Sequence, residues 1–152
     1  MYFVRKLRKD DSEILFKIKV NLSKQSEYVN KSTFDDIMLQ LEAFDHKNDS
    51  GWFGAFYEGK LVGILFVSQD QQSTHIGLLA VDQAFYGKGV SLALFMKVKE
   101  LAISANRKII TLNVDDDNKV AFSLYKRMGF QERQKTKFTT MSFKLKNNSA
   151  SW

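Results

Sequence analysis

A glycine-containing turn stands between an apolar segment and an amphipathic one, and its residue types suit the binding of a phosphate. The segment from Leu78 to Ser91 reads LLAVDQAFYGKGVS, and apolar side chains recur at helical spacing after Val90. Glycines let successive backbone N–H groups turn toward one point, and the dipole of a following helix favours an anion there. The same arrangement also occurs where only packing requires it. By itself it is therefore a weak indication of an anion site and does not identify the ligand.

Two common phosphate motifs do not match this turn. A Walker A loop needs glycine five residues before Gly87, where Asp82 stands, and serine or threonine after Lys88, where Gly89 stands. A dinucleotide fingerprint that starts at Gly87 needs a third glycine where Leu92 stands. The turn therefore suits a phosphate-bearing ligand, but neither a nucleotide triphosphatase nor a typical dehydrogenase.

A second informative segment follows about thirty residues after the turn. It reads Asn118-x-x-Ala121-x-x-x-Tyr125-x-x-x-Gly129-Phe130. Asn118 and Tyr125 are seven residues apart, nearly two helical turns, so the spacing places both on one face of a helix.

Together the two segments resemble the GNAT N-acetyltransferase superfamily, over roughly Leu61 to Glu132. In that family, an acyl-CoA-binding loop of pattern Arg/Gln-x-x-Gly-x-Gly/Ala precedes a strand and an Asn…Tyr…Gly-Phe helix. Here Tyr86 stands where the family has Arg or Gln, and Ser91 replaces the last Gly or Ala. Because backbone amides hold the phosphate, we expect weaker charge complementarity rather than lost binding, with Lys88 partly compensating. The alternative is a degenerate cofactor site.

The resemblance implies transfer of an acetyl group from acetyl-CoA, as cosubstrate, directly to a primary amine. It implies that backbone groups of Leu79 and Val81 hold the acetyl-pantetheine arm in a splayed gap between two parallel strands. The Val81 N–H would then act as an oxyanion donor, and Asn118 would order the cofactor arm or the helix start. The positions assigned to acetyl-CoA are Leu79, Val81, Tyr86, Gly87, Lys88, Gly89, Val90, Ser91 and Asn118.

Two side chains are candidates for the proton transfers. Tyr125 occupies the place of the family's usual general acid, and a phenol can donate a proton to a thiolate of comparable basicity. The other interpretation of Tyr125 is a core tyrosine. His75 lies an even number of residues before Val81, so an undistorted strand places both on one face, where an imidazole could serve as the base. A bulge would break that alternation, and a histidine just after a hairpin is commonly a surface residue.

Acidic residues occur in two loops. Glu27 and Tyr28 lie in a loop that often lines the acceptor pocket in this family, where they could recognise a cationic amine; a solvated polar loop is the other interpretation. Asp115, Asp116 and Asp117 look like a metal cluster. However, consecutive side chains point apart and one of them is needed as a helix cap, so we expect no metal site.

The pattern of apolar and polar residues predicts an α/β domain that positions these groups. The resemblance adds a central mixed, mostly antiparallel sheet with a splayed parallel strand pair and about four flanking helices. The strand after the crossover helix should lie parallel to the strand 74–81, with a right-handed connection. Asp10 or Asp11, Ser32 or Thr33, and Asp116 or Asp117 are the expected helix caps, and Gly129 is an expected helix stop. The expected strands are 2–5, 52–57, 60–68, 74–81, 108–114, 130–134 and 138–144, and the best-delimited helices are 90–105 and 118–128.

Length and composition limit the classes of protein. A chain of 152 residues that is 44% hydrophobic can form one domain, expected over 1–146, with a flexible tail over 147–152. There are no cysteines, which excludes thiol catalysis and a disulfide framework. The start is unlike a signal peptide, and no apolar run approaches membrane-spanning length. We therefore expect a cytoplasmic protein with no membrane partner.

The net charge of +6 could attract an anionic partner, but it is spread along the chain and is better explained by a solvated surface. Nucleic acid is therefore an unlikely partner. The expected function is N-acetylation of a small-molecule or protein amine, and homodimerisation is left open. The alternatives are a catalytically silent CoA-binding or interaction module on the same fold, and a basic nucleic-acid-binding domain.

Overall fold

The computed structural model describes residues 1–135 and 138–146, which form a seven-stranded mixed sheet in the order β1-β2-β3-β4-β5-β7-β6. Each neighbouring pair is antiparallel except β4 and β5, which are parallel as the sequence predicts. The predicted tail over 147–152 lies outside the described residues. The strands are β1 (Phe3–Lys6), β2 (Gly51–Tyr57), β3 (Lys60–Gln69), β4 (Ser73–Val81), β5 (Ile109–Asp115), β6 (Gln131–Lys135) and β7 (Phe138–Lys144).

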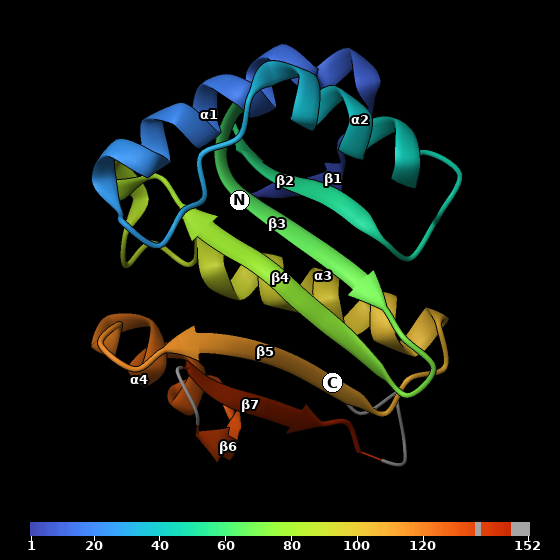
Figure 1. Ribbon diagram of the computed structural model, residues 1–152, viewed down its shortest axis with the longest axis vertical. Coiled ribbons are helices and arrows are strands. Elements are labelled where there is room, and N and C mark those ends of the chain that lie inside the picture. Colours follow the sequence, from blue (N-terminus) through green and yellow to red (C-terminus); the bar gives the residue numbers. More distant parts are fainter. Residues whose placement is uncertain (136–137, 147–152) are drawn as a thin grey trace.

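Helices cover the two faces of this sheet unequally. Figure 1 shows α1 (Ser12–Gln25) and α2 (Phe34–Phe44) over β1 to β3 on the near face, and α3 (Val90–Ser104) behind the sheet. On the near face, β4, β5 and β7 lie open in the same view. The fourth helix, α4 (Lys119–Met128), follows β5. None of the helices in the described ranges is long and apolar enough to cross a bilayer.

Two buried clusters of apolar side chains hold these layers together. The cluster on the α3 side joins the helix to β3, β4 and β5 and includes Val81, Val90 and Tyr125. The cluster on the α1 and α2 side is built around residues such as Leu15 and Ile37, which are fully buried. Both faces of β3 are therefore packing surfaces, which explains why this strand is apolar on both sides.

Local sequence determines where α2 and α4 begin and end. Thr33 caps α2 as predicted, since its side chain accepts a hydrogen bond from the Asp36 N–H. The prediction that Asp116 or Asp117 caps α4 is wrong. Asn118 is the N-cap, and its Oδ1 accepts from the Ala121 N–H at 3.3 Å. Gly129 ends α4 with φ 107°, as predicted.

Helix α1 begins differently from the prediction, because the expected cap does not form a capping hydrogen bond. Asp11 occupies the N-cap position of α1, but its side chain makes no capping hydrogen bond. Its carboxylate instead accepts two hydrogen bonds of 2.9 Å from the Arg5 guanidinium and one of 2.8 Å from the Arg8 N–H. Asp11 therefore ties β1 to the start of α1.

A close contact between α3 and β3 determines where the glycine turn lies. A Cβ added at Gly63 of β3 would lie 2.7 Å from Val90 Cγ1 and 3.1 Å from Leu94 Cδ1. Only glycine at this position lets the first turn of α3 approach the sheet so closely. The turn that precedes α3 is therefore held directly at the end of β4.

Candidate active site

In the glycine turn, defined here as residues Tyr86 to Ser91, the amides of Tyr86 and Lys88 donate to preceding carbonyls, and the glycines lie beside open space. Gly87 and Gly89 have φ values of 74° and 88°, and a Cβ added at either would meet nothing closer than 4.0 Å. Glycine is thus required here by backbone conformation and not by lack of room.

The first turn of α3 adds further backbone N–H groups to this candidate anion site. Its first backbone hydrogen bond runs from the Ala93 N–H to the Gly89 carbonyl at 3.1 Å. The three preceding helical amides, those of Val90, Ser91 and Leu92, have no partner within the helix. These N–H groups and the helix dipole favour a negatively charged ligand.

The turn is fastened to the edge of the sheet by a residue that the sequence analysis missed. Tyr2 donates a hydrogen bond from its hydroxyl to the Lys88 carbonyl at 2.7 Å. The Lys88 ammonium lies 5.5 Å from the centre of the Phe85 ring, so its charge stays beside the turn. Tyr86 is exposed over 57% of its surface. A contact spanning 86 residues of sequence leaves no local pattern from which Tyr2 could have been found.

The parallel strands β4 and β5 separate just before the glycine turn. Their register runs from Ser73 opposite Ile109 to Ile76 opposite Leu112 and stops there within the described residues. Beyond this point β4 pairs with β3 alone and β5 with β7 alone. The two strands thus leave a gap between Leu78–Val81 on one side and Asn113–Asp115 on the other; the term gap refers to this opening below.

Backbone groups of β4 face this gap. The Asp82 N–H donates to the Val62 carbonyl at 2.8 Å, and the register then places Val81 opposite Gly63 and Leu79 opposite Leu65. In an antiparallel pair, residues alternate between those that bond the partner strand and those that turn away from it. The N–H and C=O groups of Val81 and Leu79 therefore turn away from β3 and toward the gap.

Tyr125 lies in the buried cluster on the α3 side, together with Val81. Only 8% of its surface is exposed, and its ring contacts Phe130 at a centroid distance of 5.7 Å. Burial raises the pKa of the Tyr125 phenol to about 12, so the hydroxyl stays protonated at neutral pH. The described part of the chain provides this hydroxyl with no hydrogen-bond partner, yet holds no enclosed side-chain oxygen without one. The Tyr125 oxygen is therefore accessible from outside the core.

His75 lies on the opposite face of the sheet from Val81, which corrects the expectation for an undistorted strand. The register shifts between Phe66 and Val67, so that Gly77 has no partner on β3 and forms a bulge. Ile76 and Val81 both belong to the cluster on the α3 side although five residues separate them. His75, adjacent to Ile76, therefore points to the uncovered face.

The surroundings of His75 favour the neutral form of its imidazole. The Nδ1 atom lies 2.8 Å from Thr111 Oγ1 on β5, the residue opposite His75 in the parallel register. Partial burial lowers the pKa of His75, and the charge of Asp70 opposes this shift to a lesser extent. Thr111 was missed by the sequence analysis because the register of a parallel pair depends on how the crossover helix packs.

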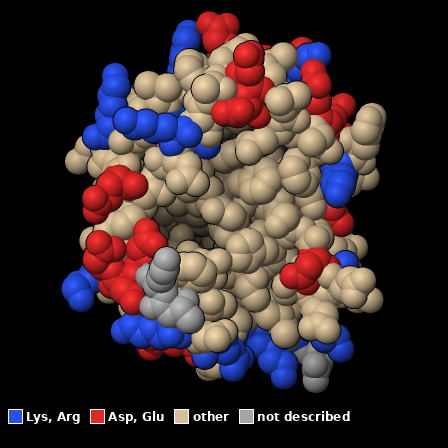
Figure 2. All heavy atoms as spheres, viewed as in Figure 1, with Lys and Arg blue, Asp and Glu red and all other residues tan. Residues whose placement is uncertain are grey.

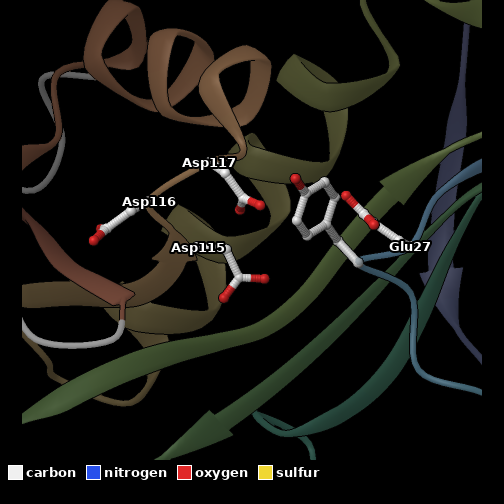
Figure 3. Close-up of a pocket in the computed structure, with 5 residues that line it drawn as sticks. Glu27, Asp115, Asp116 and Asp117 are labelled. Carbon is white, nitrogen blue, oxygen red and sulfur yellow. The ribbon is translucent and has the colours of Figure 1, made fainter.

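An acidic cavity of about 450 Å³ opens beside the gap, lined by Glu27, Tyr28, Asp115, Asp116 and Asp117. Figure 2 shows the hollowed face of the molecule with acidic residues along one side of the hollow. Figure 3 shows the carboxylates of Glu27, from the α1–α2 loop, and Asp117, from the turn before α4, on either side of an aromatic ring. Asp116 points away and accepts a hydrogen bond from Thr139 at 2.8 Å.

Tyr28 connects the two loops that border this cavity. Partial desolvation, hydrogen bonding to Glu27 and the charge of Asp117 raise the pKa of Tyr28 to about 12. The described residues contain no group of three or more side chains arranged to hold a metal ion. Of the three consecutive aspartates, for which the sequence analysis expected a helix cap and no metal site, Asp115 and Asp117 bring their carboxylates to the cavity.

Comparisons with known proteins point to one family. Residues 15–130 match the family described as "Acetyltransferase (GNAT) family". An "uncharacterized N-acetyltransferase" of Methanocaldococcus jannaschii is 34% identical over 60% of this chain, and human "N-acetylaspartate synthetase" is 33% identical over 62% of it. The chain spans only 43% and 32% of the lengths of these two relatives.

Solved structures match the fold over nearly the whole chain. The PaiA N-acetyltransferase of Thermoplasma acidophilum, solved in complex with coenzyme A, superposes with a TM-score of 0.83 at 18% identity, covering 95% of this chain and 99% of that one. The ribosomal-protein-S18-alanine N-acetyltransferase of Escherichia coli gives a TM-score of 0.74 at 16% identity, covering 97% and 98%. At these identities the matches show a common fold.

Proposed function

Since the chain belongs to the GNAT acetyltransferase family, we propose that it transfers an acetyl group from acetyl-CoA directly to a primary amine. One observation carries this proposal: Leu79 and Val81 turn their backbone groups into a gap that leads to the amides of the glycine turn. An extended, amide-containing arm that ends in a diphosphate matches both parts of this surface, because the strand edge offers amide partners and the turn offers N–H donors.

The acetyl donor would extend along β4 with its thioester at the gap. The Val81 N–H would stabilise the negative charge that develops on the thioester oxygen. The diphosphate would take the N–H groups of Val90 and Ser91, with Lys88 beside it. Asn118, which caps α4, would border the pantetheine arm. Tyr86 lacks the Arg or Gln side chain of the family pattern, whereas Ser91 is still small, and both leave the backbone donors in place.

The proton transfers would come from opposite faces of the sheet. His75 lies on the uncovered face, and Tyr125 lies on the α3 side. The amine nitrogen attacks the thioester carbon, a C–N bond forms and the C–S bond breaks. His75 lies six residues before Val81, roughly 16 Å along the strand, so it would take the proton that the nitrogen loses through intervening water, and the Tyr125 hydroxyl gives its proton to the departing sulfur. Burial raises the pKa of this phenol, so it is protonated when the thiolate leaves, and it is a weaker acid than an exposed phenol.

The acidic cavity gives the proposed acceptor its chemical class. Glu27, Asp115 and Asp117 bring negative charge to a space of about 450 Å³ that suits a small molecule. The attacking nitrogen must be neutral. Carboxylates that favour an ammonium group are therefore useful only if the acceptor has a second nitrogen that is protonated. We therefore favour a diamine or polyamine over a monoamine, and a small molecule over a protein N-terminus.

The test is release of free thiol from acetyl-CoA with a panel of acceptors. The panel contains a monoamine, a diamine, a polyamine, a free amino acid and a peptide with a free N-terminus, all at one pH and one ionic strength. The proposal expects turnover, with the highest kcat/KM for the diamine or polyamine. Binding of acetyl-CoA without thiol release from any amine would instead support the catalytically silent module. Highest kcat/KM for the peptide would overturn the assignment of the acceptor alone.

A further inference from the structure

The contact between His75 and Thr111 lies at the point where β4 and β5 separate. The two residues are opposite each other in the parallel register, one pair before the last, which joins Ile76 and Leu112. Ile110 and Leu112 point into the cluster on the α3 side, so Thr111 between them points to the uncovered face, as His75 does. The 2.8 Å contact between Nδ1 and Oγ1 therefore lies on the uncovered face, one pair before the point where the gap begins.

The second ring nitrogen of His75 is available for chemistry. Among residues 1–135 and 138–146, nothing forms a hydrogen bond with His75 Nε2, and no enclosed side-chain nitrogen lacks a partner. Because His75 is half-buried and yet its Nε2 is not enclosed, this atom reaches open space. Nδ1 alone is held by the protein, and a hydrogen bond at one ring nitrogen determines which nitrogen carries the proton in the neutral ring.

We propose that Thr111 is a positioning residue for acetyl transfer, whose hydroxyl oxygen accepts the Nδ1–H of His75 and so leaves Nε2 unprotonated on the uncovered face of the sheet, where it can receive the proton of the acceptor amine through water. This inference rests on the proposed function. A strand residue is suited to the task because its Cα is fixed by hydrogen bonds to both neighbouring strands. After proton transfer the imidazolium keeps the same Nδ1–H donor, so the contact persists through the step.

The groups packed around His75 add little charge to this arrangement. On β3 the residue opposite His75 is Ser68, and on β5 it is Thr111, both uncharged. Asp70, in the turn between β3 and β4, is the acidic group that raises the pKa of His75, less strongly than burial lowers it. The Asp70 carboxylate itself is held by the backbone N–H groups of Gln72 and Ser73 at 2.7 Å.

A spectroscopic experiment tests the inference without relying on activity. The chain has two histidines, His75 and the exposed His46, so long-range ¹⁵N–¹H correlation spectra resolve both rings, and His46 serves as internal control. Above its pKa, His75 is expected to show a protonated Nδ1 and an unprotonated Nε2. In Thr111→Val this population should be lost, and in Thr111→Ser it should be retained. A neutral His75 protonated at Nε2 in the wild-type protein would overturn the proposal.

A kinetic experiment then connects the tautomer to acetyl transfer. Thr111→Val should lower kcat by about 10- to 100-fold, part of what a general base contributes, while KM for acetyl-CoA stays unchanged. Thr111→Ser should restore most of the rate. Thr140→Val is the matched control, since Thr140 lies on the next strand, opposite Asn113 and on the same face, and donates to the Asn113 side chain.

Failure of this inference can be told apart from failure of the proposed function. A wild-type protein that acetylates amines while Thr111→Val keeps full kcat would refute the role of Thr111 and leave the function intact. Absence of turnover with every amine would refute the function, and the spectra would then decide separately whether Thr111 fixes the His75 tautomer.

Discussion

The glycine turn and the acidic cavity present polar groups from different parts of the chain, the turn from its backbone and the cavity from its side chains. At the turn, backbone amides of Val90 and Ser91 face open space, and the side chain of Tyr86 points largely into solvent. At the cavity, the polar atoms belong to side chains, those of Glu27 and Asp117 among them. Backbone donors persist when side chains change, whereas a carboxylate disappears with a single substitution. Side-chain substitutions at the glycine turn should therefore have little effect on acetyl-CoA binding. Substitutions of the carboxylates at the acidic cavity should change which acceptor is selected.

The largest effect should come from one oxygen atom on α4. Tyr125→Phe removes the proposed acid and should lower kcat by about 100-fold or more, with the Kd for acetyl-CoA unchanged. Because this hydroxyl makes no hydrogen bond in the described structure, the free energy of unfolding should change little. Tyr57→Phe is the control, and full turnover by Tyr125→Phe in single-turnover kinetics would refute the acid role.

A substitution of the turn backbone should have the next largest effect. Gly89→Glu forces a side chain into φ 88° and adds negative charge at the start of α3, so the Kd for acetyl-CoA should rise by about 100-fold. Gly59→Glu is the matched control, since Gly59 has φ 82° with nothing within 4 Å. Calorimetry should find equal loss of stability in both variants. Equal acetyl-CoA affinity in both would show that the turn is not the phosphate site.

The pH dependence of kcat should identify the base on the uncovered face. Burial lowers the pKa of His75 below the ordinary value of about 6.5, and only the neutral ring can accept a proton. At saturating acceptor, kcat should rise about tenfold per pH unit and level off with a midpoint below 6.5. His75→Gln should lower the plateau value of kcat and abolish the rise of kcat with pH. An unchanged rise of kcat with pH in that variant would mean that another group is the base.

On the acceptor side, the three aspartates provide their own control. Asp117→Asn should raise KM for a diamine by about threefold to fivefold, the value of one exposed charge pair, and leave KM for a monoamine nearly unchanged. Asp116→Asn should do neither, since Asp116 points away from the cavity toward Thr139. Added salt should reduce the difference between the two variants. Equal effects of both substitutions on the two amines would exclude selective recognition of a second cation.

The smallest effect should be at the exposed side chain of the glycine turn. Tyr86→Arg restores the charge of the family pattern, and an exposed charge of this kind should lower the Kd for acetyl-CoA by about twofold to fivefold. Isothermal titration measures this directly, with Tyr86→Gln as the uncharged control. A change of 100-fold would show that the side chain, rather than the backbone, dominates binding.

Local patterns in the sequence were enough for most elements and for the glycine turn. The hairpin at Glu58-Gly59, the cap at Thr33 and the stop at Gly129 depend on residues within a few positions, and the structure has all three. The parallel strand pair also followed from the sequence, because a helix between two strands of one sheet requires a crossover. These features are local or topological, and short-range sterics and hydrogen bonding determine them.

Side-chain direction and partnership were decided by tertiary structure. Even spacing placed His75 and Val81 on one face, but the bulge at Gly77 reversed that relation, because one unpaired residue shifts every later side chain to the other face. The contact of Thr111 with His75 depends on a register set by distant packing. The sequence by itself therefore determined the family resemblance and the backbone of the donor site. Only the tertiary structure decided which side chains from separate elements meet across the gap, because the local sequence of one strand does not determine its register with the neighbouring strand.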